Sequence, residues 1–228
     1  MFDVVDRETL QERAYAQIRA VLMRGGIAAG EKVTIRGLAD GLGMSWTPIR
    51  EAVRRLAAEG ALEIAPNRWI RVPNLSSGEL RELKMIRIHV EGWATERAAD
   101  LIDAAGMAGL WRLEADIVAL RGTTDVKEKM TRINRLHFAI YAAAGMPQLV
   151  RMIEGLWLRS APHAHLLFPV YAEQDRGRHR AATLEALAHR DGPGARQSMT
   201  RDIGGALDYL IGLVAAREAL PGEDASAR

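Results

Sequence analysis

Residues 43–60, GMSWTPIREAVRRLAAEG, decide the fold, because they predict a helix with a clear signal at each end. Ser45 is a good N-cap, and Pro48 falls in the first turn, where its missing N–H costs little. Gly60 stands where a left-handed residue is expected after the last turn. Apolar residues recur between these signals at helical spacing and form a stripe that must be buried: Ile49, Ala52, Val53 and Leu56.

The opposite face of this helix carries polar side chains suited to nucleic acid. At about 100° per residue, Thr47, Arg50 and Arg54 point the same way, and no carboxylate is expected between them. Two guanidiniums and a hydroxyl can bind phosphates and base edges. Arginines on the outer face of an amphipathic helix are usually only solvated, so the neighbouring segments must decide between the two interpretations.

The neighbouring segments complete a winged helix-turn-helix. Residues 34–42 predict a second short helix, joined to the first by the tight turn Gly43-Met44. Two short helices joined by a glycine turn form a helix-turn-helix. Residues 62–64 and 69–72 then alternate as two strands around an intervening turn. This hairpin is the expected wing.

From Leu10 through Val72 the sequence resembles the DNA-binding domain of the GntR family of bacterial transcription regulators. The matching positions keep the family's fixed spacings, and they are Gly30-Glu31, Leu38-Ala39, Leu42-Gly43, Ser45, Thr47-Pro48, Arg50-Glu51, Leu56 and Glu59-Gly60. The resemblance implies that the wing tip near Arg68 reaches the minor groove. It also implies DNA contacts at the positions of Arg36, Ser45, Thr47 and Arg50.

Two tryptophans depart from the family pattern. Trp46 stands where the family usually carries an arginine that reads guanine, and Trp69 stands where the wing usually has glycine. DNA binding remains the prediction, but the operator sequence does not follow from the resemblance. The residues expected to contact DNA are Arg36, Ser45, Trp46, Thr47, Arg50, Arg54 and Arg68.

The remainder of the chain predicts a second, all-helical domain. Helices are expected at roughly 78–103, 107–121, 125–144, 147–160, 177–190 and 194–217, and no strand pattern interrupts them. Their short connections favour an antiparallel bundle. We therefore expect a mainly α protein, with a winged helix-turn-helix domain and its small β-hairpin at residues 1–75 and a helical domain at residues 76–228.

The composition narrows the class of protein. The 228 residues are 48% hydrophobic, carry a net charge of +2 and contain no cysteine, which excludes disulfides and cysteine-ligated zinc. No uncharged apolar run is long enough to span a membrane, and the N-terminus is acidic where a signal peptide would be basic. We expect a cytoplasmic protein without a membrane partner, whose DNA binding depends on a few well-placed arginines.

The helical segments resemble FCD, the ligand-binding domain of the FadR subfamily. His137 lies on the apolar stripe of the helix at 125–144, and Asp202 on that of the last helix. A carboxylate buried without a partner is costly, so Asp202 should meet a cation, a metal or a donor. Arg180 shares the inward face of the preceding helix, with His179 at its edge. The cluster is either a structural network, with His137 and Arg180 both bonded to Asp202, or an effector cavity.

Many FCD domains hold a divalent metal with an Asp, a His four residues later and two further His. His137 matches the first histidine, but the other positions hold Ile133, Arg180 and Asp202. Asn134 lies beside the first of these, and His179 beside the second. One alternative is a zinc or nickel ion on His137, His179 and Asp202. The other is that Arg180 replaces the metal's charge and pairs with the carboxylate of an organic-acid effector.

Arg87 and Glu91 match an Arg and a Glu of the first FCD helix. Arg87 either lines the same cavity or forms a surface i,i+4 pair with Glu91. The residues expected to contact an effector are Arg87, Asn134, His137, His179, Arg180 and Asp202.

These observations favour a homodimeric, ligand-responsive transcription regulator. A repressor is expected rather than an activator. It would bind a double-stranded operator and release it when a small carboxylate enters the bundle. A dimer is expected because one short helix makes too few contacts for specific binding. The alternative is a metal-dependent or acid/base enzyme using His137 and Asp202. The sequence has no nucleophile motif, phosphate loop or HExxH, so no catalytic residue is assigned.

Overall fold

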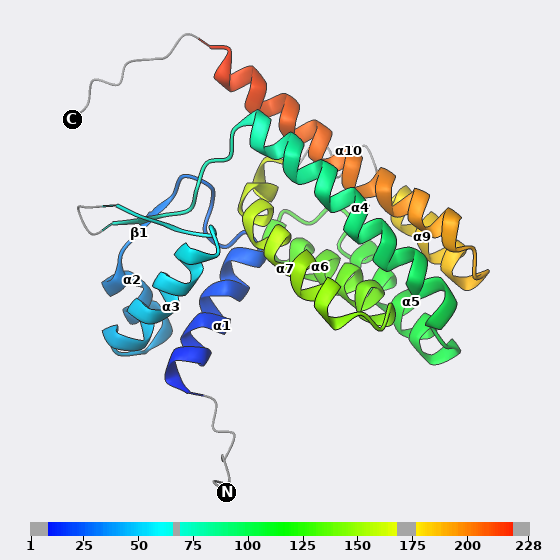
Figure 1. Cartoon of the computed structure of the whole chain (residues 1–228), viewed down its shortest axis with the longest axis horizontal. Coiled ribbons are helices and arrows are strands. Elements are labelled where there is room, and N and C mark those ends of the chain that lie inside the picture. Colours follow the sequence, from blue (N-terminus) through cyan, green and yellow to red (C-terminus); the bar gives the residue numbers. More distant parts are fainter. Residues whose placement is uncertain (1–8, 66–68, 168–176, 221–228) are drawn as a thin grey trace, which may run out of the picture. The chain divides into compact units, whose positions relative to one another are not determined.

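The computed structural model describes residues 9–65, 69–167 and 177–220, which divide into two compact units (Figure 1). The first unit comprises the residues up to Asn74 together with residues 157–162, and the second comprises residues 75–156 and those from 163 onward. Each unit buries its own set of apolar side chains. The domain boundary between residues 75 and 76 stays a prediction.

The first unit is a helix-turn-helix with a small sheet. Its elements are, in order, α1 (Leu10–Met23), β1 (Lys32–Val33), α2 (Ile35–Leu42), α3 (Trp46–Ala58), β2 (Glu63–Ile64) and β3 (Ile70–Arg71). The tight turn between α2 and α3 uses Gly43, whose φ of 62° is left-handed and therefore costs glycine little. The predicted helix-turn-helix is confirmed.

The sheet contains one strand more than the predicted hairpin. Its order is β1-β3-β2, and both pairings are antiparallel. Arg71 in β3 lies opposite Lys32 on one side and opposite Glu63 on the other. The sequence did not reveal β1, because two residues are too few to show the alternation by which a strand is recognised. The extra strand brings Lys32 to the wing.

The core of the first unit forms between α1 and α3. The predicted stripe of α3 is buried, with none of its side chains more than 2% exposed. It belongs to one core cluster with Ala14, Ile18 and Leu22 of α1. Burying an aliphatic side chain of this size stabilises the fold by about 1.5–3 kcal/mol. This burial fixes which face of α3 stays free, and that face carries Arg50 and Arg54.

Every element described after Asn74 is a helix, as the sequence predicted. The helices are α4 (Ser77–Leu101), α5 (Ala104–Val118), α6 (Val126–Ala143), α7 (Pro147–Ser160), the 3₁₀ helix η1 (Ala161–Leu167), α9 (Arg178–Ala188) and α10 (Gly192–Glu218). The sequence predicted only a break near Pro162, where the structure has η1. The mainly α fold class with a small antiparallel sheet is confirmed.

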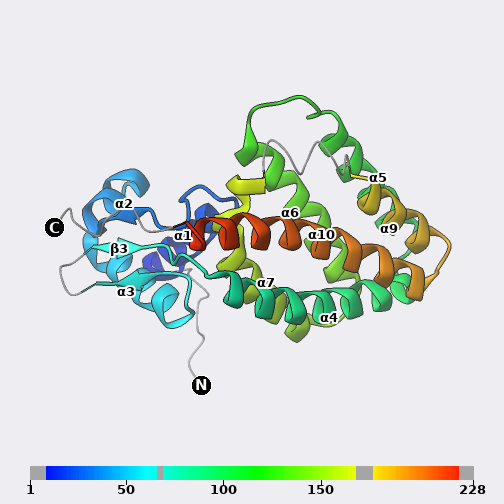
Figure 2. The ribbon, with the colours of Figure 1, turned by 90° about the horizontal axis from the view of Figure 1, so that it is seen from above.

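The two longest helices, α4 and α10, lie side by side and run in opposite directions (Figures 1 and 2). At one end of the pair, Ser77 donates its N–H to Glu218 Oε1 at 2.9 Å. Toward the other end, Arg196 Nη1 donates to Glu96 Oε2 at 2.8 Å. α6 and α9 also pack against α4, and α9 packs against α10. Among the described residues, no helix combines the length and apolar character needed to cross a membrane.

Candidate functional site

The free face of α3 presents the residues that the sequence predicted to contact DNA. Ser45, Thr47 and Arg50 are exposed, and Trp46 at the first helical position is 55% exposed. Ser45 occupies the N-cap position, but its side chain makes no capping hydrogen bond. Its hydroxyl is therefore not used by the helix, and the N–H groups of the first turn remain available to a phosphate.

Carboxylates lie closer to the arginines of this face than the sequence suggested. Glu51 accepts from Arg54 Nη1 at 2.8 Å, so the expectation of a face without a carboxylate was wrong for this arginine. Arg36 Nε on α2 lies 3.7 Å from Asp40 Oδ2. Arg50 makes no ion pair with any residue in the described parts of the chain. Of the described arginines predicted to contact DNA, Arg50 is thus the most available.

The wing is organised around Trp69. Lys32 Nζ lies 4.9 Å from the centroid of its ring, and Arg71 Cζ lies 5.5 Å from it. Arg71 also donates from Nε to Glu63 Oε2 at 3.0 Å. Tryptophan in place of glycine therefore gives the wing a surface for cation–π contacts with two neighbouring strands. Arg68, predicted at the wing tip, lies outside the described residues.

Tyr15 of α1 contacts the C-terminal end of α3. Its hydroxyl donates to Glu59 Oε2 at 2.8 Å, and Arg55 Cζ lies 3.7 Å from the centroid of its ring. Arg55 Nε in turn donates to Glu59 Oε1 at 3.2 Å. Burial and the neighbouring Glu59 carboxylate raise the pKa of Tyr15. The phenol therefore stays protonated and fixes α3 against α1.

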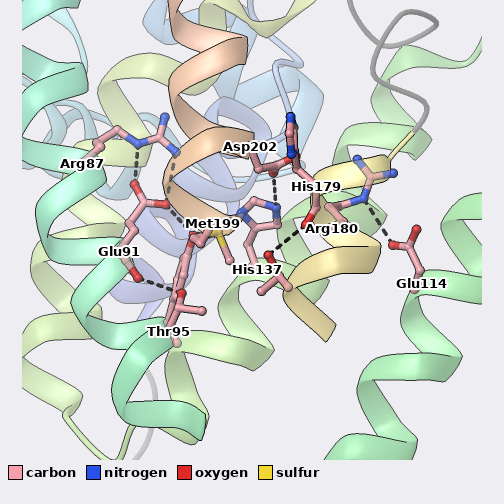
Figure 3. A network of polar contacts seen from close by, with 11 residues as sticks. Arg87, Glu91, Thr95, Glu114, His137, His179, Arg180, Met199 and Asp202 are labelled. Atoms are coloured by element: carbon pink, nitrogen blue, oxygen red, sulfur yellow. Dashed lines mark hydrogen bonds and ion pairs between the residues drawn. The ribbon is translucent and has the colours of Figure 1, made fainter. Parts of the chain in front are cut away.

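A buried polar centre lies in the second unit around His137 of α6, which is 3% exposed (Figure 3). His137 Nδ1 lies 3.1 Å from the hydroxyl oxygen of Tyr141, one helical turn further along α6. Its Nε2 lies 3.2 Å from Asp202 Oδ2 on α10. The sequence placed both residues on inward faces, and the structure brings them together.

The protons in this centre can be assigned by donor and acceptor geometry. Tyr141 has one hydroxyl proton and donates it to Glu91 Oε2 at 2.5 Å, so His137 must donate from Nδ1 to the same hydroxyl oxygen. Burial raises the pKa of Asp202, but the hydrogen bond and charge of His137, together with the charges of Arg180 and His179, outweigh burial and lower the pKa below its ordinary value. The carboxyl of Asp202 therefore stays ionised.

Arg87 and Glu91 form a buried pair on α4 rather than the surface pair that the sequence left open. Arg87 Nε donates to Glu91 Oε1 at 2.5 Å, and the two side chains are 8% and 0% exposed. Glu91 also accepts from Tyr141, and burial together with this carboxylate raises the pKa of Tyr141 well above its ordinary value. Arg87, Glu91, Tyr141, His137 and Asp202 thus form one continuous chain of contacts (Figure 3).

Arg180 pairs with Glu114 of α5, a residue that the sequence analysis missed. Its Nε donates to Glu114 Oε2 at 3.2 Å, which corrects the expectation that Arg180 bonds Asp202 (Figure 3). Burial raises the pKa of Glu114, and Arg180 offsets only part of that rise. A signal was present, because Glu114 interrupts the apolar stripe that Leu110 and Ile117 form on α5.

The remaining predicted effector residues lie on the same helices. Asn134 is buried on α6, one turn before His137. His179 is half-buried on α9, and its carbonyl accepts from Thr183 Oγ1 at 2.9 Å. Its charge adds to the larger effects of His137 and Arg180 that lower the pKa of Asp202. Asn134 and His179 therefore lie on the helices that also carry His137 and Arg180.

The donor set does not fit a divalent metal. In the part of the chain that the structure describes, no group of three or more histidine, aspartate or glutamate side chains lies close enough to hold an ion. Ile133 stands at the position of the family's aspartate and has no donor atom. Asp202 is already engaged by His137 at 3.2 Å.

A cavity of about 570 Å³ lies elsewhere in the second unit. Its lining is mostly apolar and comes from the end of α4, from α5 and from α6, and includes Leu101, Ile102, Leu110, Leu113, Ala139 and Ala143. None of the predicted effector residues lines it, so we place the candidate site at the buried polar centre.

Sequence comparison finds related regulators. The family described as bacterial regulatory proteins, gntR family, matches residues 10–72, and the FCD domain matches residues 82–205. The HTH-type transcriptional regulator McbR of Escherichia coli K12 is 32% identical over 179 residues, which cover 77% of this chain and 80% of McbR. The HTH-type transcriptional repressor GlaR of the same organism is 26% identical over 76% of this chain and 84% of its own length.

Structural comparison agrees with these matches. The structure of E. coli McbR/YncC aligns with a TM-score of 0.81 and 27% identity, covering 92% of this chain and 99% of that one. A GntR regulator from Rhodococcus sp. RHA1 aligns with a TM-score of 0.73 at 17% identity, covering 89% and 97% of the two chains, and shows likeness of fold alone.

Proposed function

Because this chain belongs to the gntR family of bacterial regulatory proteins with an FCD domain, and is therefore a DNA-binding transcription regulator, we propose that a small carboxylate controls its DNA binding. The enzyme hypothesis is wrong, since the matched families and relatives are transcription regulators. A repressor that the carboxylate releases from its operator is the form we propose, and the likeness to GlaR supports it.

We propose that α3 reads the operator in the major groove. Its free face carries Ser45, Trp46, Thr47, Arg50 and Arg54, and the opposite face is held in the core. An exposed guanidinium without a competing carboxylate, such as that of Arg50, can bind guanine through two hydrogen bonds. Arg36 and the wing with Arg68 would contact the phosphate backbone and the minor groove, which positions the helix without reading sequence.

The effector proposal is carried by one observation: polar side chains of α4, α6 and α10 form one chain of contacts that ends at His137 and Asp202 (Figure 3). Stability alone does not require them, because buried ion pairs are often no more stabilising than apolar packing. An anion entering such a low-dielectric site needs a fixed cation, and Arg180 supplies it. Asn134, His137 and His179 would orient the ligand, with Arg87 completing the charge balance behind them.

We also propose that the regulator acts as a homodimer in the cytoplasm. Operators bound by helix-turn-helix dimers contain two half-sites about one helical turn of DNA apart. Each recognition helix of the dimer then binds one half-site, and the two together supply the affinity for the whole operator. Ligand binding in the bundle would change the spacing of the two recognition helices. The DNA partner requires the cytoplasm of a bacterial cell.

Gel-shift titration tests this function, with an operator fragment selected from random-sequence DNA by the purified chain. Small carboxylates, with and without chelator, are then added to the complex. We expect at least one carboxylate to release the fragment, with no effect of the chelator. Arg180→Ala should lose this response and keep DNA binding. Arg178→Ala, which removes an exposed arginine of the same helix, should respond like the native chain.

Three results would contradict the proposal. Failure of every carboxylate to alter DNA binding would refute the effector class. Loss of the response on chelation, with stoichiometric zinc or nickel bound to the native chain and missing from His137→Ala, would replace Arg180 by a metal. A monomer on DNA, measured by light scattering, would refute the dimer.

A further inference from the structure

We propose that Glu114 is an internal competitor for the effector: its carboxylate holds the guanidinium of Arg180 in the free protein, and an effector carboxylate must displace it. This inference rests on the proposed function, in which Arg180 binds the effector. It adds a residue that determines affinity and restricts the ligand class to carboxylates that reach Arg180.

The geometry of the pair leaves room for a stronger ligand. Arg180 Nε makes a single hydrogen bond of 3.2 Å to Glu114 Oε2, which is longer than the roughly 2.7–2.9 Å of a good charge-assisted bond. Within residues 9–65, 69–167 and 177–220, Arg180 makes its ion pair with Glu114 alone. A guanidinium can bind a carboxylate through two parallel bonds, so a ligand free to align both oxygens can bind Arg180 better than Glu114 does.

The charges around the pair favour displacement over simultaneous binding. Glu114 and Arg180 are 9% and 14% exposed, so water screens them little. Burial raises the pKa of Glu114, and the nearby Asp202 carboxylate raises it further, against the effect of Arg180. The site already holds Glu114 close to Asp202. A further carboxylate at Arg180 would bring three anions together, whereas an exchange keeps the number of anions constant.

Gly177 indicates which partner moves. It directly precedes α9 with a left-handed φ of 75°, and a Cβ built there would overlap Arg180 Nη2 and lie 3.4 Å from Glu114 Oε1. The guanidinium therefore lies directly against the backbone of Gly177, which restricts its movement. Glu114 sits on α5, 66 residues before Arg180 in the sequence, and can leave by rotating its own side chain.

Calorimetric titration tests the inference, with acetate, succinate, citrate and benzoate as probes. The full chain is compared with Glu114→Gln, which keeps the shape and removes the charge. We expect the variant to bind any probe of the native chain about tenfold tighter, because a neutral amide holds the guanidinium of Arg180 less tightly than a carboxylate does. Glu114→Asp, with a shorter reach, should shift affinity in the same direction by less. Glu128→Gln removes an exposed carboxylate that pairs with Arg132 at 2.7 Å and should change nothing.

The outcomes separate this inference from the proposed function. Tighter binding by Glu114→Gln that is lost in the double variant with Arg180→Ala supports the inference, whether or not the native chain binds the probe measurably. Equal or weaker binding by Glu114→Gln, when the native chain binds a probe, overturns the competitor role and leaves the carboxylate effector standing. If no probe binds the native chain or any Glu114 variant, the proposed effector class fails and the inference fails with it. If Glu114→Gln does not fold, Glu114→Asp decides by the same criterion.

Discussion

The free face of α3 and the buried centre of the helical bundle use the same charged residue types under opposite conditions. On α3, the side chain of Arg54 is 63% exposed, and its partner Glu51 is three residues away on the same helix. In the bundle, Arg87 and Glu91 are 8% and 0% exposed, and Glu91 is held from α6 as well through Tyr141. Water can replace the partner of Arg54 but not that of Arg87.

This difference separates binding from architecture. An exposed pair contributes about 0–1 kcal/mol, so its arginine can exchange a carboxylate for a phosphate at little cost. Removing one member of a buried pair costs about 3–5 kcal/mol, because the other charge is left without water or a partner. The α3 face is therefore free to bind DNA, whereas the buried centre can change partners only when another charge enters.

The largest expected effect is on the buried pair. Glu91→Ala should lower the free energy of unfolding by about 3–5 kcal/mol, because it removes the buried carboxylate to which both Arg87 and Tyr141 donate. Urea unfolding measures it. Glu96→Ala on the same helix breaks the more exposed pair with Arg196 and should cost less than about 1 kcal/mol. Similar losses from the two variants would erase the contrast between buried and exposed charges.

A smaller loss of stability is expected on the buried face of α3. Leu56→Ala should destabilise the first unit by about 2–5 kcal/mol, since Leu56 is fully buried and the change leaves a cavity. In thermal unfolding of the full chain, Leu56→Ala should lower the transition temperature. Leu42→Ala, at a partly buried position, should lower that temperature by less. An unchanged transition for Leu56→Ala would mean that the two faces of α3 have been assigned the wrong way round.

Substitutions on the free face of α3 should change the affinity for the operator and not the stability of the fold. Arg50→Ala should weaken operator binding by about 1–3 kcal/mol in gel shift, because a base or phosphate contact is lost. The free energy of unfolding of this variant should change by less than about 0.5 kcal/mol, because Arg50 is exposed. Arg55→Ala removes the arginine stacked on Tyr15 and should leave operator affinity nearly unchanged. Equal binding losses in both variants would point to general charge attraction instead of a specific reader.

The smallest effect is expected at the exposed pair of α3. Glu51→Gln should strengthen operator binding by a few tenths of a kcal/mol to about 1 kcal/mol, because it frees Arg54 from its carboxylate. The gain should shrink as salt rises, since exposed charges are screened. Gel shifts at two salt concentrations measure it. Weaker binding by Glu51→Gln would show that this carboxylate positions Arg54 for DNA.

Local sequence patterns predicted the helices, because a helix can be recognised from the spacing of its apolar residues and from the residues at its ends. The stripe of α3, the turn at Gly43 and the inward placement of His137 and Asp202 all follow from residues within a few turns. β1 did not, since its two residues pair only through contacts with β3, far along the chain.

Partner choice among the charged residues could not be predicted in the same way. Whether Arg180 meets Asp202 or Glu114 depends on how α5, α9 and α10 pack, and both carboxylates lie on inward faces. The burial of Arg87 likewise depends on helices that cover α4 from elsewhere in the chain. Sequence periodicity gives the direction of a side chain, and tertiary packing selects its partner.

The exposure of Trp46 also has an optical consequence. Its indole is 55% exposed at the start of α3. In the free protein its fluorescence is therefore that of a hydrated indole, at long wavelength, and quenchers such as iodide can reach it. Trp157, 5% exposed, contributes emission from an apolar environment that quenchers reach poorly. If α3 enters the groove, the emission of Trp46 shifts to shorter wavelength and becomes protected. The residue that departs from the family pattern is thus a fluorophore on the face that we propose binds the operator, and the difference spectrum against Trp46→Phe isolates its signal without a label.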